Sequence, residues 1–475
     1  MSDSSPTPDV PPAVTEHVRS QVSALRDGVE RGIPRPVEAR LEQLGALRRG
    51  LVQDDAELRR ALAADLGKSA MESTVTEIGV LLAEIDTVRR NLRRWLRPER
   101  FSLGMMLAPG RGETWREPYG LALVISPWNY PLQLAISPLI GAIAGGNAAI
   151  IKPSEVAPAT SAAISRLVAE HLDPNWVRVV EGGVAETTAL LAERFNTIFY
   201  TGNAMVGRIV ARAAAENLTP VTLELGGKSP AFVDDGVDLS TTARRLVWGK
   251  FTNAGQTCVA PDYVMASRKT LDALVPYLRS AIEEMYGPVP QRSKDYGRII
   301  NTRHFDRVLA LIQDDKAVIG GTTAADRENR YIPPTVLDRI AADDPAMGEE
   351  IFGPVLPLVE VADAQDAVHR IAAGDKPLTA YVFTDDEQVV RLFTTQTSSG
   401  SLAIGVALAH LGAVAMPFGG VGESGHGAYH GRHSLEAFTH AKPVVRKPLA
   451  PDTLRLVYPP FSARRSRLVR RLFDR

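Results

Sequence analysis

The feature that most constrains the fold is an alternation of short apolar runs and helical patterns between residues 120 and 216. Runs of β-branched and aromatic residues predict buried strands, and longer segments with helical spacing separate them. Strands that alternate with helices form a parallel sheet covered on both faces. The strands are expected at LALVIS, AAIIK, VRVVEG and TIFYTG, and the helices at 158–172, 185–195 and 203–216.

A second α/β run extends from about residue 221 to TAYVFT at 379–384, and 475 residues exceed what one hydrophobic core normally supports. Two amphipathic helices are expected before the first run. A turn-forming APGRG at 108–112 predicts a projecting hairpin. The helical faces are Leu41, Leu44, Leu47 and Leu51, and then Val75, Ile78, Leu82, Ile85, Val88, Leu92 and Trp95.

Composition narrows the class of protein. The chain is 45% hydrophobic with a net charge of -1, which is typical of a soluble globular protein and disfavours nucleic acid as a partner. A single cysteine excludes an intramolecular disulfide. The N-terminus has no secretory pattern, and prolines and asparagines interrupt the apolar segment 121–151, so no membrane span is expected. We therefore expect a cytoplasmic protein.

Three motifs are misleading. Gly420, Gly422 and Gly425 spell G-x-G-x-x-G but open no helical pattern, so we expect a flexible loop there. GGKS at 226–229 lacks the earlier glycine of a phosphate-binding P-loop. Three histidines at 426, 430 and 433 lie in a glycine-rich segment without cysteine, so we expect solvated histidines and no metal site.

The only cysteine, Cys258, lies in the polar run NAGQTCVAP. A free cysteine is commonly a small buried hydrophobe, but this run offers backbone amides that favour a nucleophilic thiolate. Glu224 ends an apolar strand and is a candidate base, or else a structural carboxylate. Asn129 in SPWNYP is a candidate oxyanion donor, or else a turn residue. On residue types alone, catalytic and structural interpretations both stay open.

Seven motifs in register resemble those of the aldehyde dehydrogenase superfamily, over about residues 35–460. They are SPWNYP, KPSE, FYTGNAMVG, LELGGKSP, NAGQTCVAP, EEIFGPVLP and PFGGVGESG. FYTGNAMVG, TEIGVLLAEID, AYHGRHSLEAFTH and VYPPF look most like the class 3 branch, which acts on fatty and aromatic aldehydes. The resemblance implies a modified Rossmann cofactor domain, an α/β catalytic domain and a small β oligomerisation element.

The resemblance to aldehyde dehydrogenases also implies the bounds of the domains. We expect a disordered lead at 1–12, an NAD(P)-binding domain at 13–98 and 119–225, and a catalytic domain at 226–410. Residues 99–118 and 411–445 would form the oligomerisation and bridging element. The basic tail at 446–475 is expected to pack near the substrate entrance.

The resemblance also implies roles. Cys258 matches the nucleophile, Glu224 the general base and Asn129 the oxyanion donor. The cofactor positions are Lys152 and Glu155 at the adenosine ribose, Gly202 and Gly207 beside the pyrophosphate, Glu350 and Phe352 at the nicotinamide ribose and ring, and Trp128. The expected reaction is oxidation of an aldehyde through a thiohemiacetal and a thioester on the cysteine.

One departure from class 3 is visible, because Gly405 and Val406 stand where Asn-Asp is usual, although His410 is retained. A less polar pocket wall predicts apolar aliphatic or aromatic aldehydes as substrates. Glu155 favours NAD, with some use of NADP. We expect a homodimer without a stable membrane anchor. The alternatives are a thiol-dependent esterase or hydrolase, and a non-catalytic scaffold protein of the same fold.

Overall fold

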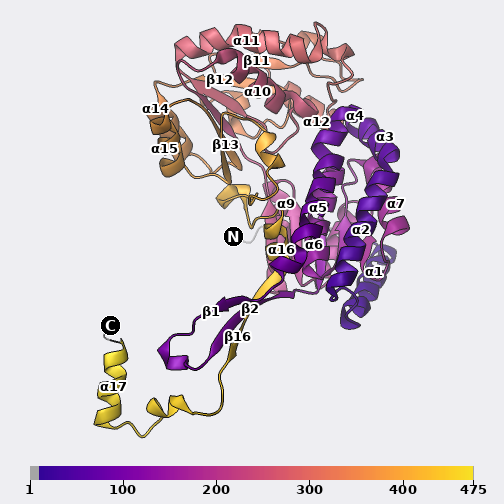
Figure 1. Cartoon of the computed structure of the whole chain (residues 1–475). Coiled ribbons are helices and arrows are strands. Elements are labelled where there is room, and N and C mark those ends of the chain that lie inside the picture. Colours follow the sequence, from indigo (N-terminus) through magenta and orange to yellow (C-terminus); the bar gives the residue numbers. More distant parts are fainter. Residues whose placement is uncertain (1–9, 474–475) are drawn as a thin grey trace, which may run out of the picture.

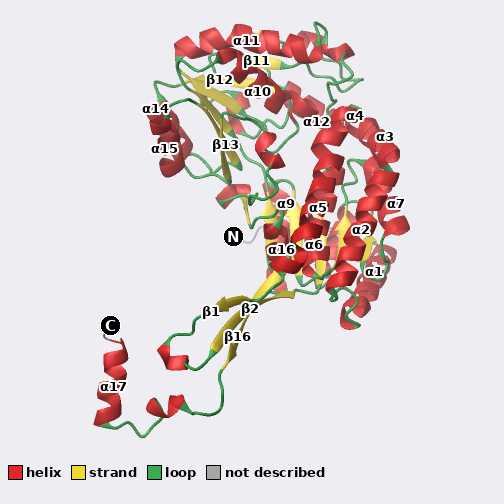
Figure 2. Ribbon diagram, in the orientation of Figure 1, coloured by secondary structure: helices red, strands yellow, loops and turns green. Residues whose placement is uncertain are grey.

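The computed structural model describes residues 10–473, which form two α/β bodies and a long projecting arm (Figure 1). Each body is built around its own mostly parallel sheet, and helices cover the sheets (Figure 2). Of the expected disordered lead, residues 1–9 lie outside the described residues, and the first helix begins at Pro12.

The first body contains a six-stranded sheet in the order β15-β7-β6-β3-β4-β5. Its strands are parallel except for the edge strand β15, which pairs antiparallel with β7. The four strands expected from the apolar runs are confirmed as β3, β4, β5 and β6. The bounds are β3 Leu121–Ile125, β4 Ala148–Lys152, β5 Val177–Val179, β6 Thr197–Thr201, β7 Val221–Glu224 and β15 Gly425–His426.

The expected helices between these strands are also confirmed, as α7, α8 and α9. Between β3 and β4, helix α6 is buried along its whole length, which accounts for the apolar segment 121–151. The helices of this body are α1 Pro12–Glu30, α2 Val37–Gln53, α3 Asp55–Leu66, α4 Ala70–Ser73, α5 Gly79–Trp95, α6 Pro131–Gly145, α7 Pro158–His171, α8 Val184–Ala192, α9 Ala204–Glu216 and α16 Arg432–Ala437.

The N-terminal region is more helical than its periodicity predicted, because α1 and α3 were not anticipated. A π-helical turn, Thr74–Ile78, precedes α5 and shifts the helical register. As a result Val75, assigned to the apolar face, is 52% exposed, whereas Glu77 and Glu84 are fully buried. The predicted face is therefore wrong at its start and correct from Ile78 to Leu92, apart from the half-buried Leu82.

The second body contains a seven-stranded sheet in the order β10-β11-β12-β9-β8-β13-β14, in which only the β10–β11 pair is antiparallel. Its strands are β8 Pro230–Val233, β9 Tyr263–Ala266, β10 Ala317–Ile319, β11 Thr335–Leu337, β12 Val355–Glu360, β13 Thr379–Phe383 and β14 Ser401–Ile404. Its helices are α10 Leu239–Phe251, α11 Arg268–Tyr286, α12 Thr302–Leu309, α13 Pro345–Gly348, α14 Ala364–Ala373 and α15 Glu387–Gln396.

The arm is a three-stranded antiparallel sheet of β1 Glu99–Phe101, β2 Arg111–Pro118 and β16 Thr439–Arg446, as the hairpin prediction required. Beyond it the chain ends in α17 Ala463–Phe473, which lies past the arm (Figure 1). The expectation that the tail packs near the substrate entrance is wrong for its own subunit. Among the described residues, no helix is long and apolar enough to cross a membrane.

Candidate active site

Polar segments follow four neighbouring strands of the first sheet at the same edge. SPWN follows β3 and LGGK follows β7, whereas KPSE and TGN begin at the last residues of β4 and β6. Because these strands are parallel neighbours, their carboxyl ends lie side by side, which is where ligands bind in open α/β sheets. The residues predicted from the sequence therefore converge on the region between the two bodies.

The cysteine lies in a tight turn after α10. A 3-10 segment, Thr252–Gly255, leads into it, and three consecutive residues from Asn253 to Gly255 have φ values of 53°, 50° and 74°. At Gly255 a Cβ atom would lie 2.2 Å from the carbonyl oxygen of Gly353, so only glycine fits. Cys258 itself is half-buried, between buried neighbours. The turn thus holds a partly accessible thiol on a rigid backbone.

Gln256 holds this turn from inside. Its amide nitrogen donates to the carbonyl oxygens of Asn253 and Arg298, each at 2.9 Å, and its amide oxygen accepts from the backbone N–H of Ile300 at 2.9 Å. The side chain is fully buried. Since a buried amide without partners is strongly unfavourable, these bonds fix the loop that carries the thiol.

The thiol lies in an environment that disfavours its charged form. Burial, together with the nearby Glu350 and Glu224 carboxylates, raises the pKa of Cys258 to about 12. The backbone N–H groups of Cys258 and Val259 act in the opposite direction. From the sequence, the backbone N–H groups of residues 255–257 were expected to stabilise the thiolate. The backbone N–H of Gln256 instead donates to the carbonyl oxygen of Asn253 within the turn.

Asn129 lies between β3 and α6, with its side chain buried beside the cysteine turn. Its side-chain nitrogen donates to the carbonyl oxygen of Gln256 at 3.1 Å. An amide nitrogen has two N–H groups, so one remains for another acceptor. The backbone carbonyl oxygen of Asn129 accepts from Lys68 Nζ at 3.1 Å and from Asn253 Nδ2 at 2.8 Å.

Beneath Asn129 lies a buried ion pair, Lys68–Glu77, which the sequence did not reveal. Both side chains are fully buried. The second carboxylate oxygen of Glu77 accepts from the backbone N–H groups of Leu132 and Gln133 at the start of α6, at 2.9 and 3.1 Å. The Lys68 ammonium also lies 3.9 Å from the centre of the Tyr130 ring. The pair therefore fixes the carbonyl group of Asn129 and the backbone that follows it, and no local pattern marks either residue.

Glu224 is the last residue of β7 and is almost completely buried. Neither of its carboxylate oxygens has a hydrogen-bond partner among residues 10–473. Burial raises its pKa well above the usual value for a glutamate. A Cβ atom at Gly419 would lie 3.1 Å from Oε1, so the chain passes close to the carboxyl group. An unpartnered carboxyl group that raises the pKa of the only thiol is a candidate proton acceptor.

Gly202 and Gly207 allow the start of α9 to pack closely against Tyr200 of β6 and against Leu225, which follows β7. A Cβ atom at Gly202 would lie 2.2 Å from the hydroxyl oxygen of Tyr200, and one at Gly207 would lie 2.9 Å from a methyl group of Leu225. Asn203 caps the helix by accepting from the N–H of Val206 at 2.9 Å. The start of α9 lines a cavity of about 470 Å³. Such a helix N-terminus suits the phosphates of a dinucleotide.

The other predicted cofactor residues lie around the same edge. Lys152 is buried, and its ammonium donates to Glu155 at 2.9 Å, whose side chain is half exposed. Trp128 packs edge-on against Phe352, with ring centres 5.3 Å apart. Glu350 lines the same cavity as the start of α9, and burial raises its pKa to about 8. The predicted cofactor positions therefore lie in three groups: the Lys152–Glu155 pair, the turn of Gly202 and Gly207, and Glu350 with the Phe352–Trp128 contact.

Two expectations about the C-terminal glycine-rich segment are wrong. Instead of a flexible loop, Gly425 and His426 form β15, in which Gly425 pairs with Glu224 and tolerates a close approach of the Leu223 carbonyl. His430 is not solvated but buried, and its ring stacks on Phe418 with centres 5.5 Å apart. Both residues depend on packing against the first sheet, which the local glycine content does not indicate.

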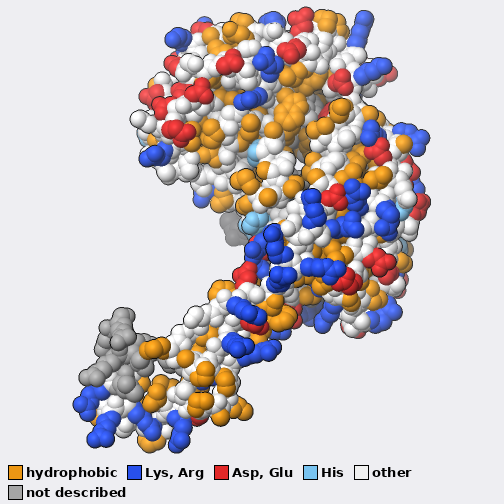
Figure 3. All heavy atoms as spheres, in the orientation of Figure 1, with side chains coloured by type: hydrophobic (Ala, Val, Ile, Leu, Met, Phe, Trp, Pro, Cys, Tyr) orange, Lys and Arg blue, Asp and Glu red, His pale blue; other side chains and the backbone are white. Residues whose placement is uncertain are grey.

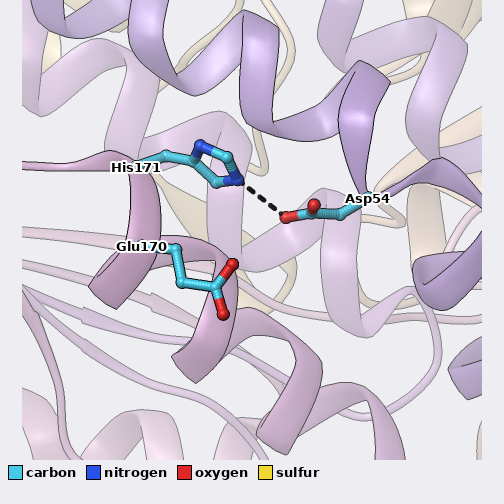
Figure 4. Close-up of side chains that lie close together, drawn as sticks. All are labelled: Asp54, Glu170 and His171. Atoms are coloured by element: carbon cyan, nitrogen blue, oxygen red, sulfur yellow. Dashed lines mark hydrogen bonds and ion pairs between the residues drawn. The ribbon is translucent and has the colours of Figure 1, made fainter.

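A group of metal-ligating atoms occurs elsewhere, among Asp54, Glu170 and His171 (Figure 4). His171 Nε2 lies 2.9 Å from Asp54 Oδ2 and joins the end of α7 to the turn between α2 and α3. Glu170 is exposed, and the group includes none of the predicted active-site residues. The hydrogen bond between the helices accounts for the placement of His171 and Asp54.

The fold and the site are typical of an enzyme, because a thiol and an unpartnered buried carboxyl group lie together at the ligand-binding edge of a parallel sheet. Residues 2–444 match the sequence model of the aldehyde dehydrogenase family. Rat aldehyde dehydrogenase family 3 member B1 is 44% identical over 450 residues, which cover 94% of this chain and 96% of the rat protein. The rat dimeric NADP-preferring aldehyde dehydrogenase is 43% identical over 451 residues, covering 95% and 99%. Substrate-bound AldH of Staphylococcus aureus superposes with a TM-score of 0.93 and 39% identity, over 96% of this chain and 99% of that one.

The chain belongs to the aldehyde dehydrogenase family, and its relatives confirm the resemblance to the class 3 branch. It is an NAD(P)-dependent aldehyde dehydrogenase. The sequence-based prediction of the fold class, with Rossmann-like parallel sheets, is confirmed by the structural match.

Proposed function

We propose that Cys258 attacks the aldehyde, that Asn129 stabilises the resulting oxyanion and that Glu224 activates the hydrolytic water. The observation that carries this assignment is the buried, unpartnered carboxyl group of Glu224 beside the only thiol of the chain. A carboxyl group in that state has no structural hydrogen bond to maintain, so it is free to accept a proton from water.

In the first step the thiol gives its proton to solvent water and the sulfur forms a bond to the carbonyl carbon, while the π-electron pair of the C=O bond moves to the oxygen. We expect the free N–H of Asn129 and the backbone N–H of Cys258 to donate to the oxygen as it becomes negative, because one side-chain N–H of Asn129 is left by its bond to Gln256 and the Cys258 N–H lies beside the sulfur. When bound, NAD(P)⁺ supplies the acceptor for the hydride that leaves this carbon, and a thioester remains on Cys258. Glu224 then takes a proton from water as the water oxygen attacks the thioester carbon. The C–S bond breaks, the carboxylic acid leaves, and Glu224 returns the proton to the sulfur, which restores the thiol.

The predicted cofactor residues fit a dinucleotide. Gly202 and Gly207 leave the start of α9 without side chains that would obstruct phosphates, and the Lys152–Glu155 pair offers polar groups for a ribose. Glu350 and Phe352 would hold the nicotinamide side, and Trp128 packs behind Phe352. We propose NAD as the preferred cofactor because Glu155 disfavours a 2′-phosphate, with some use of NADP, as in the relative named NADP-preferring.

The substrate is proposed to be an apolar aliphatic or aromatic aldehyde. Cys258 packs against the same apolar cluster as Trp248, Leu408 and Leu411, which would present a hydrophobic wall to the substrate. Rates with hexanal, benzaldehyde and succinic semialdehyde test this assignment. A higher kcat/KM for the charged succinic semialdehyde would contradict it.

We propose that the enzyme is a cytoplasmic homodimer and that the arm makes the subunit contact, with 99–118 and 411–445 as oligomerisation and bridging segments. The arm stands clear of both bodies and carries apolar side chains on its surface (Figure 3). Phe101 is 54% exposed, Trp115 43% and Val445 55%, which a second copy would cover. One relative is named as dimeric. Sedimentation of wild-type protein and of Trp115→Glu measures the assembly.

The central test is formation of NAD(P)H with a panel of aldehydes. Cys258→Ala is expected to abolish turnover while cofactor binding, measured by calorimetry, stays close to that of the wild type. Ester hydrolysis without any NAD(P) binding would instead favour the thiol hydrolase. Absence of NAD(P)H formation across the whole panel would favour a non-catalytic scaffold.

A further inference from the structure

The GGKS run at 226–229, which resembles the end of a phosphate-binding loop, has another task in this fold. Lys228 Nζ donates to Asp262 Oδ2 at 2.5 Å and to the carbonyl oxygens of Ala346 and Glu349 at 2.8 and 2.9 Å. An ammonium has three N–H donors, and these three acceptors satisfy all of them. Lys228 is therefore engaged by the chain itself, and its partners lie around the loop that carries Glu350.

That loop is held from a second side as well. The other oxygen of Asp262 accepts from the backbone N–H of Ile351 at 3.1 Å. On the far side Arg307 donates to the carboxylate of Glu349 at 2.9 Å and to the carbonyl oxygen of Ile351 at 2.6 Å. Residues 346–351 are thus fixed by charged side chains from β7–β8, the cysteine segment and α12.

The glycines of the run accommodate the side chain of Glu350. A Cβ atom at Gly226 would lie 2.0 Å from Glu350 Oε2. Any residue other than glycine would therefore displace the carboxylate. The backbone N–H of Gly227 lowers the pKa of the same carboxyl group, against the effect of burial. Gly226, Gly227 and Lys228 together form a cradle, in which two residues hold the carboxyl group and the third holds its loop.

The cradle is also tied to the nucleophile. Asp262 follows Cys258 by four residues, it is almost completely buried, and its N–H donates to the carbonyl oxygen of Ser229 at 2.7 Å. The fully buried Lys250 ammonium lies 3.9 Å from its carboxylate. The same carboxylate therefore anchors the loop of Glu350 and the segment that carries the thiol.

We propose that Lys228 is a positioning residue for the cofactor, which acts through Asp262 and the loop carbonyls to set Glu350 for the nicotinamide ribose. This inference rests on the role proposed above for Glu350. Its consequence is that removing the ammonium weakens cofactor binding and hydride transfer, whereas the cysteine chemistry that needs no cofactor continues.

The test compares Lys228→Met with Lys316→Met. The control breaks the Lys316–Asp344 pair, which lies in the same body and matches the Lys228–Asp262 pair in side-chain exposure, at 26% and 8% against 22% and 4%. It removes no hydrogen bond to residues 346–351. Two activities are measured for each variant: aldehyde oxidation as a function of NAD⁺ concentration, and hydrolysis of p-nitrophenyl acetate without cofactor.

For Lys228→Met we expect the KM for NAD⁺ to rise by about tenfold or more, which corresponds to the loss of about one good polar contact. Ester hydrolysis is expected to stay within about twofold of the wild type, as both activities do in Lys316→Met. Asp262→Asn keeps an acceptor for Ile351 but loses the ion pair, so a smaller rise in KM is expected. If Lys228→Met does not fold, Asp262→Asn decides by the same criteria.

The results that would overturn the positioning role of Lys228 differ from those that would overturn the proposed role of Glu350. Glu350→Gln with a raised KM, together with a wild-type KM in Lys228→Met, overturns the positioning role alone. An equal fall of both activities in Lys228→Met, at unchanged KM, shows a purely structural role and also overturns it. A wild-type KM in Glu350→Gln contradicts the role of Glu350 itself, and this inference with it.

Discussion

Alkylation of Cys258 as a function of pH measures how strongly the site holds the thiol in its neutral form. The thiolate is the reactive species, and burial together with the nearby carboxylates raises the pKa of this group to about 12. At pH 8 that value leaves a thiolate fraction of about 10⁻⁴, whereas an ordinary cysteine with a pKa of about 8.5 is roughly one quarter ionised. The cofactor-free enzyme should therefore hold about three orders of magnitude less thiolate than a free thiol.

The assay uses iodoacetamide and intact-protein mass spectrometry on the cofactor-free enzyme. Because the chain contains one cysteine, every alkylated molecule reports on Cys258. Below its pKa a thiol gains about a factor of ten in thiolate per pH unit, so the rate should rise about tenfold per unit from pH 7 to 10 without a plateau. Restricted access lowers the rate equally at every pH, and the slope therefore reports the pKa alone.

Glutathione under the same conditions is the control, and its rate should level off near its own pKa. A plateau for the enzyme below pH 9 would refute the reasoning, since burial would then not govern the thiol. Glu350 is the larger of the two charged contributions. Replacing it in Glu350→Gln should lower the thiol pKa and speed alkylation above pH 8, where the carboxyl group of the wild type is ionised.

Three further predictions concern buried polar residues of the first body. Asn129→Ala should lower kcat by about 10²–10³ with little change in cofactor KM, because it removes an oxyanion donor, and a fall of less than about tenfold in steady-state rates would contradict that role. Lys68→Met should lower the free energy of unfolding in urea by about 3–5 kcal/mol, because it leaves Glu77 buried and unpaired, and Lys68→Met with Glu77→Gln should recover part of the loss. Burial raises the pKa of Glu84 to about 7, so the folded state retains a proton that the unfolded state loses near pH 4.5. Stability should therefore fall by about 3 kcal/mol as the pH rises through that window, and urea titrations of Glu84→Gln should show a correspondingly smaller fall.

The sheet of the first body could be predicted because its signal is local. Each of β3, β4 and β6 is a continuous apolar run, and a parallel strand covered on both faces requires no more than that. The same argument places polar residues such as Asn129 and Glu224 at the carboxyl ends of strands, where they gather at one edge. The approximate location of the site followed from the strands alone.

The supporting groups could not be predicted, because their burial depends on distant segments. Glu77 and Glu84 look like solvent-facing residues of an amphipathic helix, yet Glu77 meets Lys68 and the start of α6, and Glu84 meets Ser137 and Ser434. A π-helical turn before α5 sets which residues face inward, and no propensity argument indicates it. For Lys228, the GGKS motif suggested a phosphate-binding loop, and nothing in the sequence indicated its contacts with Asp262 and the loop carbonyls.

The polar run around Cys258 shows how these two levels combine. Its polarity indicated a site and not a core, yet Asn253 and Gln256 are fully buried. A buried amide is tolerated only when it is hydrogen-bonded, and here the partners are Asn129 and backbone groups of residues 298 and 300, far away in the chain. The run can therefore adopt its active shape only after both bodies have packed against it. It follows that the geometry around the thiol depends on the interface between the two bodies. For that reason the sequence could identify the thiol but not the arrangement that holds it.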